Sequence, residues 1–103
     1  MVKGAIEQGA ILKIEGIKSP ILVISKSYYN RTTGQIIGCP VVNKDIENAI
    51  YKKINTSSIS GTVLCDNLRN FDLLTRGYSL LDSVSFSDMM IICDIVQGLI
   101  DYL

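Results

Sequence analysis

The side chains of this chain that could act on a substrate are lysines, serines and asparagines, because its 103 residues include no histidine. Ser-His-Asp and Cys-His nucleophiles, histidine zinc sites and two-histidine ribonuclease chemistry are therefore excluded. Lysine can still bind phosphates, and residues 1–53 carry a net charge of +4, against −4 for residues 54–103. We expect a basic half that could meet phosphates and an acidic half that could meet a basic partner, or a surface on which both charges intermix.

Two short polar segments stand next to two predicted strands. Ile21–Ile24 follows Pro20 and is a run of aliphatic residues typical of a strand buried on both faces. A polar, turn-rich hairpin connection over residues 25–34 leads to the next strand, Gln35–Val42, where a glycine and a proline indicate a bulge or an edge. We expect these two strands to be antiparallel neighbours.

That pairing would place the start of one strand beside the end of the other. Lys18 and Ser19, which precede the first strand, would then lie close to Asn43 and Lys44, which follow the second. The pair Lys52-Lys53 adds two more cations a few residues later. For each of these residues a solvated surface position is the alternative to a phosphate contact.

The remaining elements are short strands and one long terminal helix. The helix is predicted to begin at an N-cap, Ser87, and its apolar stripe reaches Leu103. Gly98 interrupts it, which would suit a closely approached backbone, and the stripe is wide enough for a partner chain to cover part of it. The other predicted elements are a strand over 10–15, a short strand over 49–54, a strand over 62–65, one or two helical turns over 66–72 and a strand over 78–84.

The three cysteines, Cys39, Cys65 and Cys93, lie far apart among apolar neighbours and form no CxxC pair. This pattern predicts reduced, buried thiols in a cytoplasmic protein. We expect no signal peptide and no membrane helix, since the apolar runs are too short. The length predicts one domain, residues 1–103, and the fold class is mainly β with a terminal helix, a small curled sheet or partly open barrel.

The order of these segments resembles the PemK/MazF family of toxin–antitoxin toxins over nearly the whole chain. The resemblance rests on the order and spacing of several stretches, namely Gly9–Ile11, Pro20–Ser25, Tyr29–Gly34, Cys39–Pro40, Val63–Asp72 and Leu80–Leu99. It implies an SH3-like barrel of the CcdB/PemK/MazF type that forms a homodimer. It also implies cytoplasmic growth inhibition by cleavage of single-stranded RNA without metal or cofactor, and neutralisation by a cognate antitoxin.

The family's chemistry uses an arginine just before the proline and a threonine at the end of the following strand. Here Ser19 precedes Pro20, and the threonine position falls at or near Val42. The long first loop that helps the family to grip RNA is also missing. Either the site is rebuilt, or catalysis is lost. A rebuilt site would use Lys18, Ser19 and Asn43 as catalytic residues and Lys44, Lys52 and Lys53 as RNA-binding residues.

Two further functions remain open if catalysis is lost. Related CcdB toxins share the barrel but inhibit a topoisomerase through protein contacts, so the fold does not decide the target. The chain could therefore bind a protein target, or it could bind only its antitoxin.

Overall fold

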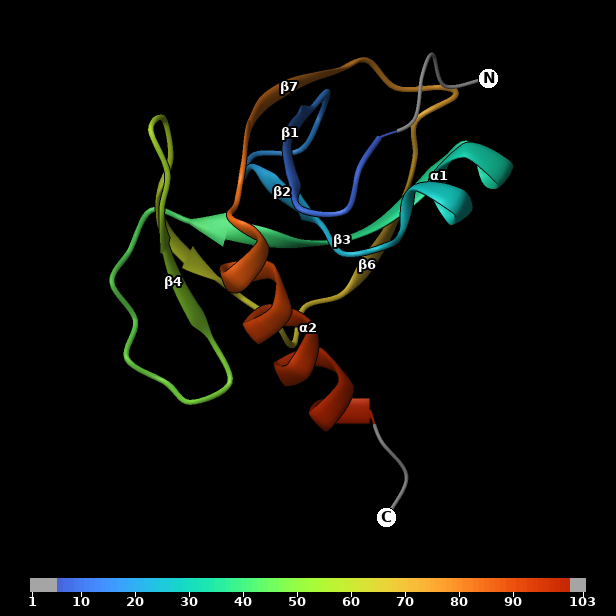
Figure 1. Ribbon diagram of the computed structural model, residues 1–103. Helices are drawn as coiled ribbons and strands as arrows, with labels where there is room; N and C mark the ends of the chain where they lie inside the picture. The colour runs from blue at the N-terminus through green and yellow to red at the C-terminus, as the bar shows by residue number, and fades with distance from the viewer. Residues whose placement is uncertain (1–5, 101–103) are drawn as a thin grey trace.

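The computed structural model describes residues 6–100, which form seven strands and two helices (Figure 1). Within these residues no helix is long and apolar enough to cross a membrane. The elements are β1 Ala10–Ile14, β2 Ile21–Val23, α1 Ser27–Thr33, β3 Gln35–Val42, β4 Lys52–Asn55, β5 Ser60–Val63, β6 Arg69–Asp72, β7 Tyr78–Ser83 and α2 Phe86–Ile100.

The strands form one curled antiparallel sheet in the order β4-β5-β3-β2-β1-β7, and β6 pairs with β3 beside this path. On one side β3 changes partner along its length: residues 35–38 pair with β6, and Val41 and Val42 pair with β5. The sheet therefore opens into two branches at Cys39–Pro40. The predicted fold class, a mainly β structure with a terminal helix, is confirmed.

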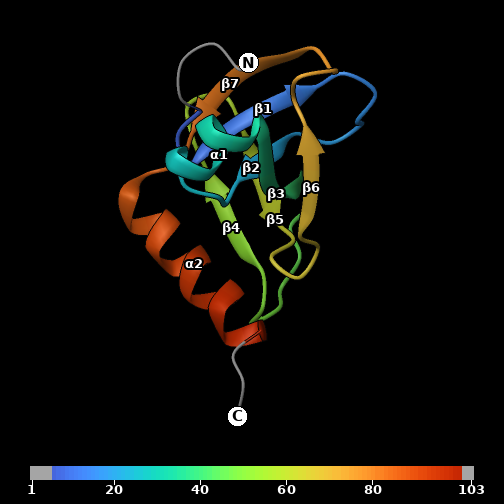
Figure 2. The ribbon, with the colours of Figure 1, turned by 90° about the vertical axis from the view of Figure 1, so that its right-hand side faces the viewer.

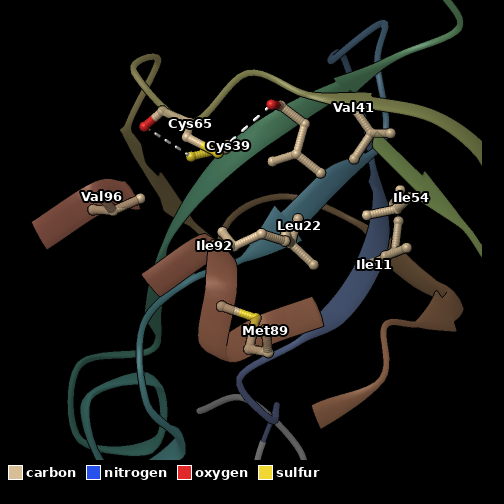
Figure 3. Packing of buried hydrophobic residues seen from close by; sticks show 10 residues of the cluster. Ile11, Leu22, Cys39, Val41, Ile54, Cys65, Met89, Ile92 and Val96 are labelled. Carbon is tan, nitrogen blue, oxygen red and sulfur yellow. Dashed lines mark hydrogen bonds between the residues drawn. The ribbon is translucent and has the colours of Figure 1, made fainter. Parts of the chain in front are cut away.

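The two faces of the sheet bury two apolar clusters, as the alternation of strand side chains requires. Ile21 and Val23 of β2 point into one cluster, with Leu12, Ile36 and Phe71. Leu22, between them, points into the other, which α2 covers with Met89, Ile92 and Val96 (Figure 3). The prediction that this short strand is buried on both faces is therefore confirmed.

The hairpin connection predicted over residues 25–34 contains the helix α1. Its side chain Asn30 is buried and donates hydrogen bonds to the carbonyls of Ile6, at 2.6 Å, and Ser25, at 3.2 Å. The helix ends at Gly34, whose φ of +72° is the left-handed conformation that favours glycine. The segment still joins two antiparallel strands, but it does so through a helix, because Asn30 has a buried partner distant in sequence, the Ile6 carbonyl.

The helical turns predicted over residues 66–72 are wrong, because residues 69–72 form strand β6. Ile36 of β3 pairs with Phe71 in this ladder, and the Phe71 side chain lies in the core. The spacing of Leu68, Phe71 and Leu74 suggested a helix, but long-range pairing with β3 decides the conformation.

The terminal helix was predicted correctly, although its cap was not. The helix begins at Phe86, and the hydroxyl of Ser85, not that of Ser87, accepts a hydrogen bond from the Asp88 N–H at 3.1 Å. An added Cβ at Gly98 would meet nothing within 4 Å, so no other part of the described chain approaches its backbone. Leu103, the predicted end of the stripe, lies outside the described residues.

Candidate functional site: a polar groove along strand β4

A polar groove of about 570 Å³ runs along strand β4, which lies at one end of the sheet path. The segment after β3, the strands β4 and β5 and the first turn of α2 contribute its walls; Figure 2 shows β4 between β5 and α2. The lining residues are Asn43, Lys44, Asp45, Lys52, Lys53, Ile54, Asn55, Ser60, Gly61, Thr62 and Asp88.

Four of the six residues that the sequence selected line this groove: Asn43, Lys44, Lys52 and Lys53. They come from two segments, the end of β3 and the start of β4, which the β-sheet brings together around β5. A groove with three ammonium groups and amide side chains can bind an anion such as a phosphate.

Lys18 and Ser19 do not line the groove. The predicted pairing that placed them near the end of β3 is nevertheless correct, since β2 and β3 are antiparallel and Ile21 pairs with Pro40. The Val41 N–H donates to the carbonyl of Pro20 at 2.8 Å. Lys18 is exposed and Ser19 half-buried at this same end of the two strands.

Carboxylates offset much of the positive charge in the groove. The ammonium of Lys52 lies 3.4 Å from Asp88, and that of Lys53 lies 2.8 Å from Asp45 and also contacts Glu47. The hydrogen bonds that the Lys53 ammonium donates to Asp45 and then to Glu47 raise the pKa of Lys53. Within residues 6–100 Lys44 forms no ion pair, so its charge is the one that the groove leaves available to a ligand.

Several polar residues of the groove were not predicted from the sequence, and Thr62 on β5 is the buried one among them. Its side chain is fully buried, and its hydroxyl lies 2.6 Å from the carbonyl of Lys44. A threonine inside a predicted strand has no sequence signal that separates such a contact from an ordinary surface position.

Within residues 6–100 no cysteine lines this groove; Cys39 and Cys65 are buried as predicted, whereas Cys93 is only partly buried. Burial raises the pKa of Cys39 to about 12 and that of Cys65 to about 11, and neither side chain lines the groove. Both thiols lie in the α2-side cluster, where the Cys39 sulfur is 3.8 Å from the carbonyl of Cys65 (Figure 3). In the described part of the chain no three Cys, Asp or Glu side chains gather as metal ligands.

A second, apolar groove of about 670 Å³ lies between β1, β7 and the start of α2. Three of its lining side chains are largely exposed: Leu80 at 67%, Phe86 at 80% and Met90 at 53%. Exposed apolar side chains grouped in this way are typical of a surface that another protein covers.

No family model matches the sequence, and no curated protein resembles it closely enough to count as a relative. Solved structures do match its fold. A chain of the MazE–MazF crystal structure from Deinococcus radiodurans has a TM-score of 0.87 at 22% identity, covering 97% of this chain and 100% of that chain. For MazF alone from the same organism the TM-score is 0.84 at 21% identity, with the same coverage.

An endoribonuclease in complex with its cognate antitoxin, from Mycobacterial species, has a TM-score of 0.81 at 18% identity, covering 96% of this chain and all of that one. The curled antiparallel sheet with a C-terminal helix is thus a small β fold that this chain shares with these solved structures. Within that fold class the chain has the fold of MazF, as the resemblance to the PemK/MazF family predicted.

Proposed function

We propose that this chain is the toxin of a toxin–antitoxin pair and inhibits growth as a metal-independent endoribonuclease on single-stranded RNA. The observation that carries the proposal is the match of almost the whole chain to MazF and to an endoribonuclease bound to its antitoxin. The polar groove along β4 supports it, because three lysines line this groove at the end of the sheet.

Metal-free cleavage needs groups that hold the phosphate and move two protons. The 2′-hydroxyl loses its proton and attacks the adjacent phosphorus, while the 5′-oxygen leaves and gains a proton, which yields a cyclic phosphate and a 5′-hydroxyl. In the proposal Lys44, Lys52 and Lys53 bind RNA phosphates. Asn43 in the groove, and Lys18 and Ser19 beside the end of β3, are the catalytic candidates that stabilise the charged phosphate.

The test is incubation of the purified protein with a long single-stranded RNA in EDTA, followed by mapping of new 5′ ends. We expect specific cuts that Lys44→Ala weakens and that Lys18→Ala and Ser19→Ala abolish. Lys26→Ala, which removes an exposed lysine outside the groove, should cleave as the wild type does. Intact RNA at high protein excess would contradict the nuclease assignment.

A second function, growth inhibition by binding a protein target without cleavage, is favoured by one observation. Two of the three groove lysines are already paired with carboxylates of this chain, which weakens their attraction for RNA. For this function we expect growth arrest with intact cellular RNA and a protein target in pull-downs. If the chain binds only its antitoxin, its expression should be harmless while antitoxin binding persists.

We further propose that the chain forms a homodimer through the apolar groove between β7 and α2. Burial of Leu80, Phe86 and Met90 against a second copy would remove three large apolar side chains from water. A cognate antitoxin is the second expected partner, because two of the matched structures contain a MazE–MazF complex and an endoribonuclease–antitoxin complex.

A further inference from the structure

Thr62 is a fully buried polar side chain on the face of β5 that points away from the apolar core. Its neighbour Val63 points into the apolar cluster that α2 covers with Met89, Ile92 and Val96. Because side chains alternate along a strand, Thr62 must point to the opposite face. Directly paired residues of antiparallel strands lie on one face, and Thr62 pairs with Val42 of β3 and Lys53 of β4. Both of these neighbours are at least partly exposed, whereas Thr62 has a relative exposure of 0%.

The segment that follows β3 explains this burial, because hydrogen bonds attach it to Thr62. The Thr62 hydroxyl donates to the carbonyl of Lys44 at 2.6 Å and accepts from the N–H of Ile46 at 3.3 Å. A single hydroxyl therefore fixes the backbone on both sides of Asp45. The ion pairs of this segment within residues 6–100 join Asp45 and Glu47 to Lys53, and both carboxylates are largely exposed.

Exposed ion pairs contribute little to the order of a loop, whereas a buried hydroxyl with two backbone partners is costly to replace. Among the polar contacts of residues 44–46 within the described chain, those of the Thr62 hydroxyl are thus the strongest constraint. Lys44 lines the groove from this segment, and its ammonium has no carboxylate partner within residues 6–100 to hold it. The backbone that Thr62 holds sets the point from which the Lys44 side chain extends into the groove.

We propose that Thr62 is a positioning residue of the polar groove, which fixes residues 44–46 and so directs the ammonium of Lys44 toward an RNA phosphate. The RNA part of this inference rests on the function proposed above, whereas the positioning of the segment does not. Thr62 itself touches no substrate in this arrangement, since its hydroxyl is occupied by the backbone of residues 44 and 46.

The first test is hydrogen exchange of the backbone amides in Thr62→Val, which keeps the shape of the side chain and removes the hydroxyl. We expect the Ile46 amide to exchange about tenfold faster than in the wild type, because its acceptor is gone. Thr62→Ser, which keeps the hydroxyl, should protect Ile46 as the wild type does. Equal exchange of Ile46 in Thr62→Val and the wild type would overturn the proposal.

The second test measures whether Thr62 acts through Lys44. The dissociation constant for a single-stranded RNA is measured for the wild type, Lys44→Ala, Thr62→Val and the double variant. We expect Lys44→Ala to weaken RNA binding about fivefold in the wild type and less than about twofold in Thr62→Val. In the Thr62→Val background the displaced Lys44 ammonium already contributes little to the affinity, so its removal changes the affinity little. The same loss in both backgrounds would show that Lys44 binds RNA independently of Thr62 and would overturn the proposal.

The two tests separate this inference from the proposed function. If the wild type does not bind RNA, the RNA function fails, while the exchange of Ile46 still decides whether Thr62 positions the segment. If Thr62→Val does not fold, Thr62→Ser and Thr62→Ala replace the pair, because they also differ by one hydroxyl. Thermal unfolding of each variant verifies that the compared proteins are folded.

Discussion

The hydroxyl of Thr56 lies 2.6 Å from a carboxylate oxygen of Asp82, and this contact joins the two ends of the sheet. Thr56 follows β4, the strand at one end of the path, whereas Asp82 belongs to β7 at the other end. The same oxygen accepts hydrogen bonds from the Ser58 N–H at 2.9 Å and the Ser57 hydroxyl at 3.2 Å. One carboxylate thus holds the β4–β5 turn against β7 and closes the curled sheet.

This contact predicts that the stability of the fold depends on pH through the ionisation of the Asp82 carboxyl. The hydrogen bond from Thr56, followed by those from the Ser83 and Ser58 N–H groups, lowers the pKa of Asp82 from 3.8 to about 2. A carboxyl with a lower pKa in the folded state stabilises the fold above its unfolded pKa. That contribution is therefore complete above about pH 4 and is lost as the pH falls toward 2.

We expect Asp82→Asn to be less stable than the wild type at pH 6 and to approach the wild type at pH 2. Urea denaturation between pH 2 and 6 measures the difference. Asp94→Asn, at an exposed position of α2, serves as the control and should follow the wild type throughout. A difference between Asp82→Asn and the wild type that does not change with pH would contradict this role of Asp82.

The buried side-chain amide of Asn30 leads to a second prediction, which concerns the helix α1 that was not predicted from the sequence. Asn30 donates to the Ile6 and Ser25 carbonyls, and the Ser25 hydroxyl donates to its side-chain oxygen at 2.5 Å. Asn30→Leu has a similar size but leaves these groups without partners. We expect a loss of about 1–3 kcal/mol in the free energy of unfolding, measured by urea denaturation.

Arg31→Ala is the matched control, because it alters the next residue of α1 at an exposed position. Its free energy of unfolding should stay within about 0.5 kcal/mol of the wild type. An Asn30→Leu variant as stable as the wild type would show that these hydrogen bonds are not required for the helix.

Local sequence patterns were sufficient to predict a helix or strand where residues close in the sequence decide its conformation. The aliphatic run Ile21–Ile24 and the apolar spacing of the last helix predicted β2 and α2, and the predicted antiparallel pairing of the two strands around residues 25–34 is confirmed. The sequence did not reveal α1 and β6, because partners distant in the chain decide both of them. Asn30 needs the Ile6 carbonyl, and Phe71 needs the β3 ladder.

Part of the polar groove could also be predicted from the sequence, and part of it could not. Asn43, Lys44 and the pair Lys52-Lys53 were identified from charge and from the strand ends, and the structure brings them into one groove. The pairing of Lys53 with Asp45 and the role of Thr62 depend on how the segment after β3 folds back over β5. No periodicity or spacing encodes that fold-back, so the sequence could not predict it.

The apolar groove between β7 and α2 leads to a prediction about charged substitutions within it. We expect Leu80→Glu with Met90→Glu to convert a dimer into a monomer in sedimentation at micromolar concentration, since a carboxylate would have to be buried on each side. Tyr28→Ser removes an apolar side chain of α1 that is 71% exposed and lies outside the groove, so this variant should remain dimeric. A wild type that sediments as a monomer would contradict the homodimer itself.

The carboxylates around Lys53 predict a gain of RNA affinity when they are neutralised. Asp45 and Glu47 are 79% and 91% exposed, so their contacts with Lys53 are weak enough for a phosphate to replace them. In the double variant Asp45→Asn with Glu47→Gln, the Lys53 ammonium no longer has to break an ion pair with these carboxylates before it binds an RNA phosphate. We expect tighter binding, and a slope of log affinity against log salt that is steeper by about 0.7, the value for one more phosphate contact on a single strand.

Lys53→Ala separates this effect from the general loss of negative charge. If the carboxylates act by occupying Lys53, the gain in affinity and in slope should disappear when Lys53→Ala is added to the double variant. A gain that persists without Lys53 would mean that Asp45 and Glu47 merely repel the RNA backbone at a distance. In that case Lys44, whose ammonium has no carboxylate partner within residues 6–100, would be the principal phosphate contact of the groove.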